Sequence, residues 1–245
     1  MKGIILAGGS GTRLRPMTLV TSKQLLPIYD RPMIFYPLET LLRAGIKDIL
    51  IIVAPDRAGD FLRVLGSGKE WGAKFTYEIQ DKPNGLAEAF IIGADFIDNE
   101  NVTLILGDNV FIGKDEEISD AISTFTKGGR VFAKEVPDPE RFGVVEFDSQ
   151  SNVVSIEEKP PQPKSNNALI GLYVFDNRVV DIAKGLTPSA RGELEITDVH
   201  KAYQGWSELD VRMFSGEWLD TGTPESLLEA GKLIAGWGKT HPPIR

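Results

Sequence analysis

The chain contains no cysteine and only two histidines, His200 and His241. The absence of cysteine excludes disulfide bonds, thiolate nucleophiles, structural zinc sites and iron–sulfur clusters. With two histidines, a metal site built from several imidazoles is impossible, and a Ser-His-Asp triad would have to use one of the two. A chain without cysteine fits a reducing compartment, and we expect a cytoplasmic protein.

Long apolar runs and an excess of positive charge are also missing. No apolar stretch approaches the length of a membrane span, and the first one, residues 3–7, is too short for the core of a signal peptide. The net charge of −8 argues against nucleic-acid and anionic-membrane partners, because both need clustered cations. A small anionic substrate is not excluded, since it responds to the local field of a cleft.

The first half of the chain alternates between strand and helix patterns. We expect strands over residues 2–7, 46–54, 74–80 and 102–106, with helices over 32–44, 56–65 and 85–96. This alternation predicts an α/β fold with a parallel sheet and helices on both faces. Because the carboxyl ends of such strands share one edge, the loops 8–15, 80–85 and 107–109 should converge.

The second half has shorter strands, which predict a mixed or antiparallel extension of the same sheet. These strands are expected over residues 130–136, 142–147, 153–157, 168–175 and 211–214, and helices over 179–186, 193–203 and 224–235. Residues 218–222 are expected to form a loop. Thr223 then caps the last helix and Pro224 takes its first position. The tail from Lys239 to Arg245 should be loosely ordered.

A glycine loop, Gly8-Gly9-Ser10-Gly11, follows the first strand, and Arg13, Arg15 and Lys23 add three cations. Leu14 stands where a dinucleotide fingerprint has its last glycine, and no Gly-Lys-Ser/Thr follows, so neither that motif nor a P-loop is present. Glycines alone would favour a tight turn. Together with the cations, they predict a loop whose N–H groups and Arg13 bind a polyphosphate.

Two carboxylates lie where a metal could bind. Asp108 follows a buried strand and is placed for Mg²⁺, although Asp and Asn are also common turn residues. Asp220, close to the last helix, is the second candidate.

The other charged residues have simpler interpretations. Glu158 and Lys159 would be a solvated cluster in the absence of other information. The spacing of Glu193, Glu195 and Asp198 is typical of the exposed side of a helix, and His200 is expected on a helix surface.

Seven segments occur together in this order: LAGGSGTRL (6–14), SKQLLP (22–27), GDN (107–109), ERFGVVEF (140–147), EEKP (157–160), RGELEITD (191–198) and WLDTGT (218–223). This set resembles the sugar-1-phosphate nucleotidylyltransferases, and within them the thymidylyltransferases that act on glucose 1-phosphate. The resemblance covers Lys2 to about Leu233. It implies a Rossmann-like three-layer α/β/α fold in a single domain. Residues 1–110 would form the nucleotide-binding half, 111–236 the sugar-binding half, and 237–245 a tail.

The resemblance implies transfer of a thymidylyl group from dTTP to glucose 1-phosphate, which gives dTDP-glucose and pyrophosphate. The displacement would be Mg²⁺-dependent and in line at the α-phosphorus, and would serve the synthesis of dTDP-rhamnose and other precursors of cell-surface polysaccharides. UTP or another hexose 1-phosphate is the alternative within this chemistry, and a non-catalytic sugar-nucleotide sensor is the alternative of another class. A homo-oligomer, dimer or tetramer, is expected. Many family members carry a further C-terminal helical segment, which contributes to subunit contacts and feedback control.

The resemblance also implies residue roles. The nucleotide-binding set is Leu6, Gly8, Gly9, Gly11, Thr12, Arg13, Lys23, Gln24, Gln80, Pro83, Gly85 and Asp108, with Gln80 and Gly85 reading the thymine edge. The sugar-phosphate set is Asn109, Gly143, Glu158, Lys159, Leu169 and Trp218. The catalytic set is Arg13, Lys23, Asp108 and Lys159, and the magnesium ligands are Asp108 and Asp220. Phe142 stands where many members have tyrosine, so one hydroxyl near the sugar is missing.

Overall fold

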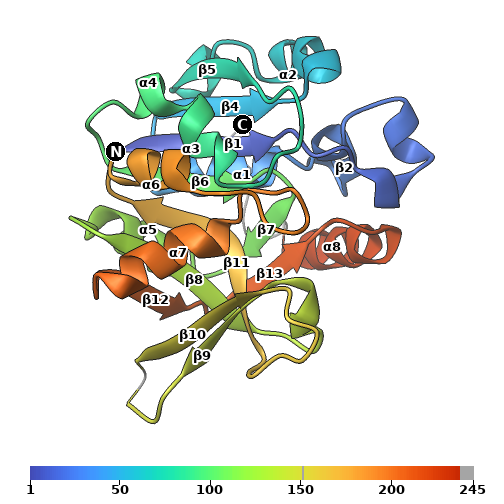
Figure 1. Cartoon of the computed structure of the whole chain (residues 1–245). Helices are drawn as coiled ribbons and strands as arrows, with labels where there is room; N and C mark the ends of the chain where they lie inside the picture. The colour runs from blue at the N-terminus through green and yellow to red at the C-terminus, as the bar shows by residue number, and fades with distance from the viewer. Residues whose placement is uncertain (151, 238–245) are drawn as a thin grey trace.

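The computed structural model describes residues 1–150 and 152–237. A nine-stranded sheet forms its centre, with the path β10-β9-β11-β6-β1-β4-β5; β8 pairs with β11, and β12 pairs with β8 (Figure 1). The strands are β1 (Lys2–Ala7), β4 (Asp48–Val53), β5 (Lys74–Ile79), β6 (Val102–Leu106), β8 (Gly129–Glu135), β9 (Gly143–Phe147), β10 (Val153–Glu158), β11 (Asn167–Phe175) and β12 (Leu209–Met213).

The sheet is parallel in its first half and mixed beyond β6. Strand β1 pairs in parallel with β4 on one side and with β6 on the other, and β4 pairs in parallel with β5. Strand β11 is antiparallel to β6, β8 and β9, while β12 is parallel to β8. Both the parallel sheet and its mixed extension are therefore confirmed.

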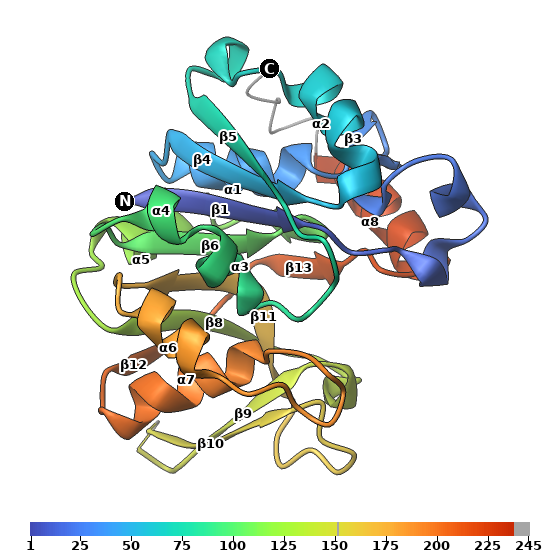
Figure 2. The same cartoon turned by 45° about the horizontal axis from the view of Figure 1, so that its top comes forward.

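Helices cover both faces of the sheet. Along β1, Ile5 and Ala7 join the core under α1 (Phe35–Arg43), α2 (Ala58–Leu65) and α5 (Asp115–Ser123). Ile4 and Leu6 point to the opposite core, under α3 (Glu88–Ile92), α4 (Ala94–Ile97), α6 (Val179–Gly185) and α7 (Ile196–Gly205), as Figure 2 shows. Because both faces are covered, the central strands are mostly apolar, which explains their clear sequence signal.

A small second sheet lies beside the carboxyl end of β6. Strand β7 (Asn109–Ile112) pairs antiparallel with β13 (Glu217–Asp220), so that Asn109 lies opposite Asp220. The prediction of a loop over 218–222 is therefore wrong for its first part. A four-residue strand with a charged residue at each end carries little period-two signal, and its partner lies far away in the sequence. A further short pair, β2 (Pro27–Ile28) and β3 (Arg31–Pro32), follows the glycine loop.

Helix α8 (Pro224–Trp237) begins as predicted, because the backbone N–H of Ser226 donates to the Thr223 hydroxyl at 3.2 Å. The helix extends to Trp237, so the expected tail does not include that residue. The prediction of loose order over residues 239–245 lies outside the described residues.

Two predicted helices have different bounds. The helix expected over 85–96 is divided into α3 and α4, and Gly85, with φ of 112°, lies in a loop before them. Helix α7 begins only at Ile196, so Glu193 and Glu195 precede it. His200 shares the buried face of α7 with Ile196 and Tyr203 and is 0% exposed, so its predicted surface position is wrong.

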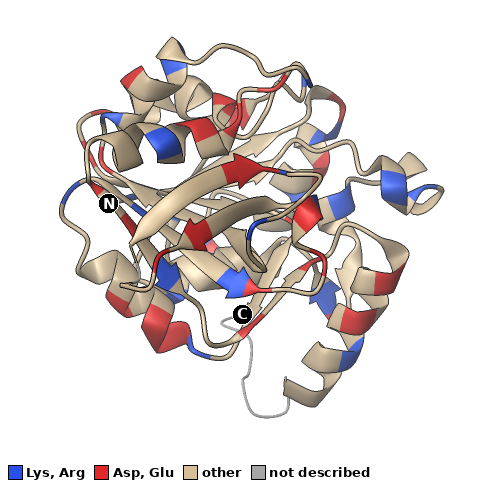
Figure 3. Ribbon diagram, turned by 60° about the horizontal axis from the view of Figure 1, so that its bottom comes forward, with Lys and Arg blue, Asp and Glu red and all other residues tan. Residues whose placement is uncertain are grey.

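In the described part of the chain, no helix is both long and apolar enough to cross a membrane. Acidic and basic residues are interspersed along the helices and strands in Figure 3.

Candidate active site

A cavity of about 440 Å³ lies at the carboxyl edge of the parallel strands. Its wall combines the three loops that were expected to converge with residues from the mixed half of the sheet. The lining residues are Leu6, Gly9, Arg13, Lys23, Gln24, Gln80, Pro83, Gly85, Leu86, Leu106, Asp108, Asn109, Arg141, Phe142, Gly143, Glu158, Lys159, Leu169, Gly171, Tyr173, Arg191, Glu193, Glu195, Ile196, Thr197, Trp218 and Asp220.

The glycine loop contributes Gly9 and Arg13 to this wall, whereas Gly8, Gly11, Thr12 and Arg15 do not line it. Gly8 is still required by packing, because a Cβ there would lie 2.5 Å from Oε1 of Gln80. Gly11 has φ of 60°, and its carbonyl accepts the Thr18 hydroxyl at 2.8 Å. The two glycines therefore shape the loop, and Arg13 supplies its charge.

Lys23 and Asp108 form a largely buried ion pair in the wall of the cavity. Burial opposes the charged form of Asp108, but the adjacent Lys23 ammonium holds the pKa of this carboxyl below its usual range. Asp108 is thus a charged carboxylate at neutral pH. Gln24, buried next to Lys23, accepts the Ser22 hydroxyl at 2.7 Å.

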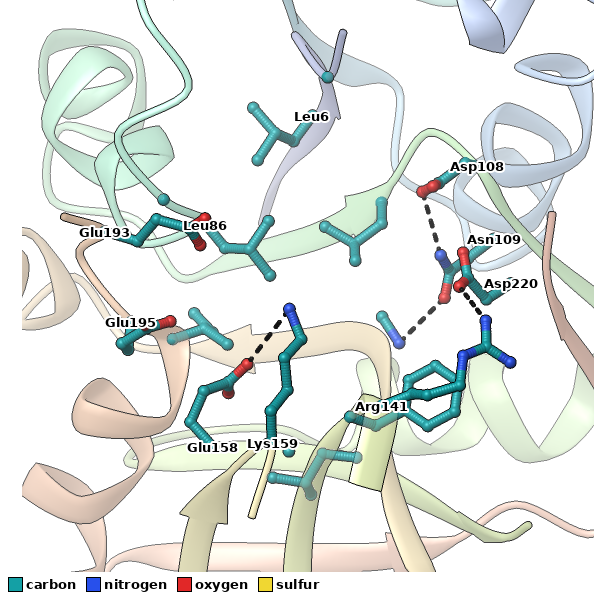
Figure 4. Close-up of a pocket in the computed structure, with 18 of the residues that line it drawn as sticks. Leu6, Leu86, Asp108, Asn109, Arg141, Glu158, Lys159, Glu193, Glu195 and Asp220 are labelled. Carbon is teal, nitrogen blue, oxygen red and sulfur yellow. Dashed lines mark hydrogen bonds and ion pairs between the residues drawn. The ribbon is translucent and has the colours of Figure 1, made fainter. Parts of the chain in front are cut away.

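Asp220 is the second carboxylate and comes from the end of β13. The backbone N–H of the next residue, Thr221, donates to the Asp108 carbonyl at 3.0 Å, which joins the two acidic residues. Burial and the negative charge of Asp108 raise the pKa of Asp220 to about 6. Arg141 lies 3.4 Å from Asp220, and both are seen beside Asp108 in Figure 4.

These two carboxylates fit a magnesium ion. Mg²⁺ takes hard oxygen ligands, and in nucleotide enzymes it is held by one or two carboxylates together with substrate phosphates and water. The pair faces a cavity lined by Arg13 and Lys23, where a phosphate can reach it. The negative charge of Asp108 repels the charged form of Asp220. A divalent cation bound by both carboxylates would offset this repulsion. Asp108 and Asp220 are the residues that would hold the ion.

Glu158 and Lys159 lie on the opposite side of the cavity with Glu193 and Glu195 (Figure 4). Lys159 has φ of 42°, and its backbone N–H donates to the Phe142 carbonyl at 3.0 Å. A non-glycine residue in this region of φ is strained, which is common at functional sites. Burial raises the pKa of Glu158, while Lys159 opposes the shift. The interpretation of this pair as a solvated cluster is therefore wrong for Glu158, whereas the Lys159 side chain is exposed.

Arg191 lies among three carboxylates on the same side. Its guanidinium is 3.7 Å from Glu158 and 3.2 Å from Glu195, and it also pairs with Glu193. The Ser189 hydroxyl donates to Glu195 at 2.6 Å. The prediction that Glu193 and Glu195 lie on the exposed side of a helix is wrong, because a loop before α7 turns them into the cavity.

Gln80 and Gly85 lie in the third part of the wall. The amide nitrogen of Gln80 donates to Glu88 at 2.8 Å, and the side chain is 5% exposed. Beyond Gly85, the backbone pairs with the segment before α7: the Leu194 N–H donates to the Asn84 carbonyl at 2.7 Å. The loop that contains Gly85 and the segment before α7 are therefore connected by backbone hydrogen bonds.

Sixteen of the residues to which the sequence analysis gave a binding, catalytic or metal-ligating role line this cavity, and several lining residues were not singled out. Among the charged ones, Arg141 and Arg191 were missed as individual residues. Both lie inside segments that carried the family resemblance, residues 140–147 and 191–198, and their presence there was the available signal. Leu86, Leu106, Gly171, Tyr173, Ile196 and Thr197 carry no signal of their own, because only the fold brings them to the cavity.

Comparisons with known proteins agree with this geometry. The family model described as "Nucleotidyl transferase" matches residues 2–236. The chain is 56% identical over 238 residues to glucose-1-phosphate thymidylyltransferase of Neisseria gonorrhoeae, covering 96% of this chain and 82% of that protein. It is 51% identical over 236 residues to the Mycolicibacterium smegmatis enzyme of the same name, covering 96% and 82%.

Solved structures show the same fold. A Bacillus anthracis protein assigned as a glucose-1-phosphate thymidylyltransferase, in complex with sucrose, superposes with a TM-score of 0.89 at 44% identity, covering 95% of this chain and 94% of that one. A UDP-glucose pyrophosphorylase in complex with UDP-glucose superposes with a TM-score of 0.83 at 25% identity, covering 96% and 98%.

Proposed function

The chain belongs to the nucleotidyl transferase family, and from this membership we propose that it transfers a thymidylyl group from dTTP to glucose 1-phosphate. The products are dTDP-glucose and pyrophosphate. The observation that carries this proposal is the division of charge in the cavity. At one side Lys23 pairs with Asp108, and Arg13 and Asp220 both lie beside Gly222. At the other side Lys159 and Arg191 both lie within 4.0 Å of Glu158. Such a cavity can hold two phosphorylated substrates with their phosphates facing each other.

The chemistry needs charge neutralisation rather than a general base. A phosphate oxygen of glucose 1-phosphate is already an anion at neutral pH, and it attacks the α-phosphorus of dTTP. A new P–O bond forms, the bond from the α-phosphorus to the bridging oxygen breaks, and pyrophosphate leaves with that electron pair. The described cavity contains no histidine that could act as a base, and none is required.

The side chains of this chain supply position and charge. Arg13 would bind the leaving pyrophosphate and Lys23 the phosphates of the nucleotide. Lys159 would bind the incoming sugar phosphate, with Arg191 beside it. Groups that are fixed in a partly dehydrated cavity stabilise developing charge without reorganisation. Mg²⁺, held by Asp108 and Asp220, would supply electrostatic stabilisation at the α-phosphate when bound.

The polar groups far from the phosphates would select the substrates. Gln80 and Gly85 are proposed to read the thymine edge, and Glu158 the sugar hydroxyls. The nucleotide would lie over residues 1–110 and the sugar over 111–236. We also expect a homo-oligomer that acts in the cytoplasm and supplies dTDP-glucose for cell-surface polysaccharides.

A panel assay tests the substrate pair. Pyrophosphate release is measured from dTTP, UTP, ATP and GTP against several hexose 1-phosphates, each with and without Mg²⁺. The expected result is the highest kcat/KM for dTTP with glucose 1-phosphate, and loss of activity when Mg²⁺ is chelated. A higher kcat/KM for UTP or another sugar would correct the substrate. Tight binding of dTDP-glucose without release from any pair would instead indicate a sugar-nucleotide sensor.

A further inference from the structure

The amide of Asn109 lies between the indole of Trp218 and the carboxylate of Asp108. Its oxygen accepts the Trp218 Nε1–H at 2.7 Å and the Gly171 backbone N–H at 3.2 Å. Its nitrogen donates to Oδ1 of Asp108 at 3.2 Å (Figure 4). An indole N–H and a backbone N–H can only donate, so these two groups determine which end of the amide faces them. The amide nitrogen must then face Asp108.

The surrounding backbone is built around this amide. Asn109 lies opposite Asp220 in the register of β7 and β13, and Trp218 is two residues earlier on the same face of β13. Strand β11 approaches at a glycine, because a Cβ on Gly171 would lie 2.5 Å from Oδ1 of Asn109. Asn109 itself is 2% exposed. The arrangement is therefore fixed by three strands and is not a contact between mobile surface groups.

The two oxygens of Asp108 receive different protein donors. Lys23 contacts Oδ2, and Asn109 contacts Oδ1. A carboxylate oxygen has lone pairs for more than one partner, so both oxygens remain able to bind a cation from the cavity. The donor at Oδ1 sets the rotation of the carboxylate, because Oδ1 must stay within reach of the Asn109 amide nitrogen.

We infer that Trp218 and Asn109 are positioning residues that orient the Asp108 carboxylate for a divalent cation. This inference rests on the proposed function for the identity of the cation site. Because the Trp218 N–H is committed to Asn109, Trp218 offers the sugar its ring and not a hydrogen bond. The ring also packs edge-on against Phe142, with centroids 5.1 Å apart. Trp218, which we propose faces the sugar, is thereby connected through Asn109 to the cation ligand Asp108.

The test measures cation affinity directly. Trp218→Phe keeps an aromatic ring next to Phe142 and removes the N–H donor to Asn109. Binding of Mn²⁺ to the substrate-free protein is followed by the electron paramagnetic resonance signal of the free ion. Loss of a hydrogen bond that supports a metal ligand typically weakens metal affinity about 10- to 100-fold. We expect a Kd for Mn²⁺ at least about tenfold higher in the variant, and the Mg²⁺ concentration for half-maximal pyrophosphate release should rise in parallel.

Trp71→Phe is the matched control. Trp71 is also buried, packs edge-on against Phe35 at 4.8 Å and does not line the cavity, so its substitution should leave the Kd for Mn²⁺ unchanged. If Trp218→Phe does not fold, Asn109→Ser replaces it, because serine keeps an acceptor for the buried N–H groups but is too short to reach Asp108.

The outcomes separate this inference from the proposed function. A Kd within twofold of the wild-type value in a folded variant would overturn the inference, and so would a wild-type protein that does not bind Mn²⁺. A weakened Kd in a protein that releases no pyrophosphate from any substrate pair would support the positioning role while contradicting the proposed reaction.

Discussion

At the scale of single residues, Arg13 and Arg15 differ although they are two positions apart. Arg13 lines the cavity, and a Cβ on Gly222 would lie 2.8 Å from its Nη2, whereas Arg15 does not line the cavity. Only Arg13 can therefore reach a phosphate that lies beside Asp108 and Asp220.

We predict that Arg13→Ala lowers kcat about a hundredfold, which corresponds to roughly 3 kcal/mol of lost electrostatic stabilisation. Asp108→Asn, which keeps the size of the side chain, should lower kcat at least as much. Initial rates of pyrophosphate release check both. Arg15→Ala is the control from the same loop and should retain wild-type turnover. Near-normal turnover of a folded Asp108→Asn protein would contradict the assignment of Asp108 as a metal ligand.

His200 is a residue whose charge affects stability and not catalysis. It lies 5.2 Å from the Tyr173 ring and 5.9 Å from Phe175, and neither ring nitrogen has a hydrogen-bond partner among the described residues. Burial lowers the pKa of His200 to about 3, from 6.5 for an exposed imidazole. The folded state therefore binds the proton less readily than the unfolded state.

The sign of the pH dependence follows from this difference. The stability due to neutral His200 is fully present above pH 6.5 and is lost as the pH falls toward 3. Well below pH 6.5 the loss approaches about 1.4 kcal/mol per pH unit, or roughly 2 kcal/mol by pH 4.5. The free energy of unfolding is measured with urea at pH 7 and at pH 4.5. We predict that its decrease between these two pH values is about 2 kcal/mol smaller in His200→Phe than in the wild type. Equal losses in both proteins would show that His200 is not buried in neutral form.

At the scale of elements, backbone hydrogen bonds join the loop before α3 to the loop before α7. The Leu194 N–H donates to the Asn84 carbonyl at 2.7 Å, and the Ala87 N–H donates to the Leu194 carbonyl at 3.2 Å. Gly85 lies between these bonds with φ of 112°, and a Cβ there would lie 2.4 Å from the Leu194 carbonyl oxygen. Only glycine allows this approach.

We predict that Gly85→Ala separates the two loops. The free energy of unfolding should fall by about 2 kcal/mol or more, because a strained φ is added to a backbone clash. The KM values for both substrates should rise, since both loops line the cavity. Gly72→Ala is the control, because Gly72 has φ of 64° and nothing lies within 4 Å of a Cβ added there. Its free energy of unfolding should fall by only about 1 kcal/mol, and KM should not change. Unchanged KM values in Gly85→Ala would show that the loops bind substrate independently.

The same elements show what the sequence could predict. Ile49–Val53 is apolar without interruption, and residues 102–105 contain one polar residue, the buried Thr103. Helices cover both faces of these strands, and this pattern identified the parallel strands. The carboxyl ends of those strands then placed Asp108 near the glycine loop. Strand β13 could not be predicted in this way, because its few residues become a strand only through pairing with β7.

The loop before α7 was mispredicted for a related reason. Glu193, Glu195 and Asp198 have a spacing that suits a helix, but the backbone bonds of Leu194 to Asn84 and Ala87 hold the first part of this segment extended along another loop. Contacts between loops that are far apart in the sequence override local spacing. Glu193 and Glu195 reach the cavity from such a loop, and they were among the least predictable residues of the cavity wall.

At the scale of the whole molecule, the single sheet carries two kinds of binding edge. Its parallel half ends in the glycine loop and Asp108, and its mixed half ends in Glu158 and Lys159. The small β7–β13 sheet lies between them and brings Asp220 to Asp108. One rigid framework can thus hold two phosphorylated substrates in line, which is the central requirement for a direct displacement.

The most direct test of this account follows the oxygen atoms of the sugar phosphate. Glucose 1-phosphate labelled with ¹⁸O in its three terminal phosphate oxygens is incubated with dTTP, Mg²⁺ and the wild-type protein, and the products are analysed by mass spectrometry. Direct attack on the α-phosphorus predicts that all three labelled oxygens appear in dTDP-glucose and none in pyrophosphate. Labelled pyrophosphate, or the absence of dTDP-glucose, would contradict the proposed reaction.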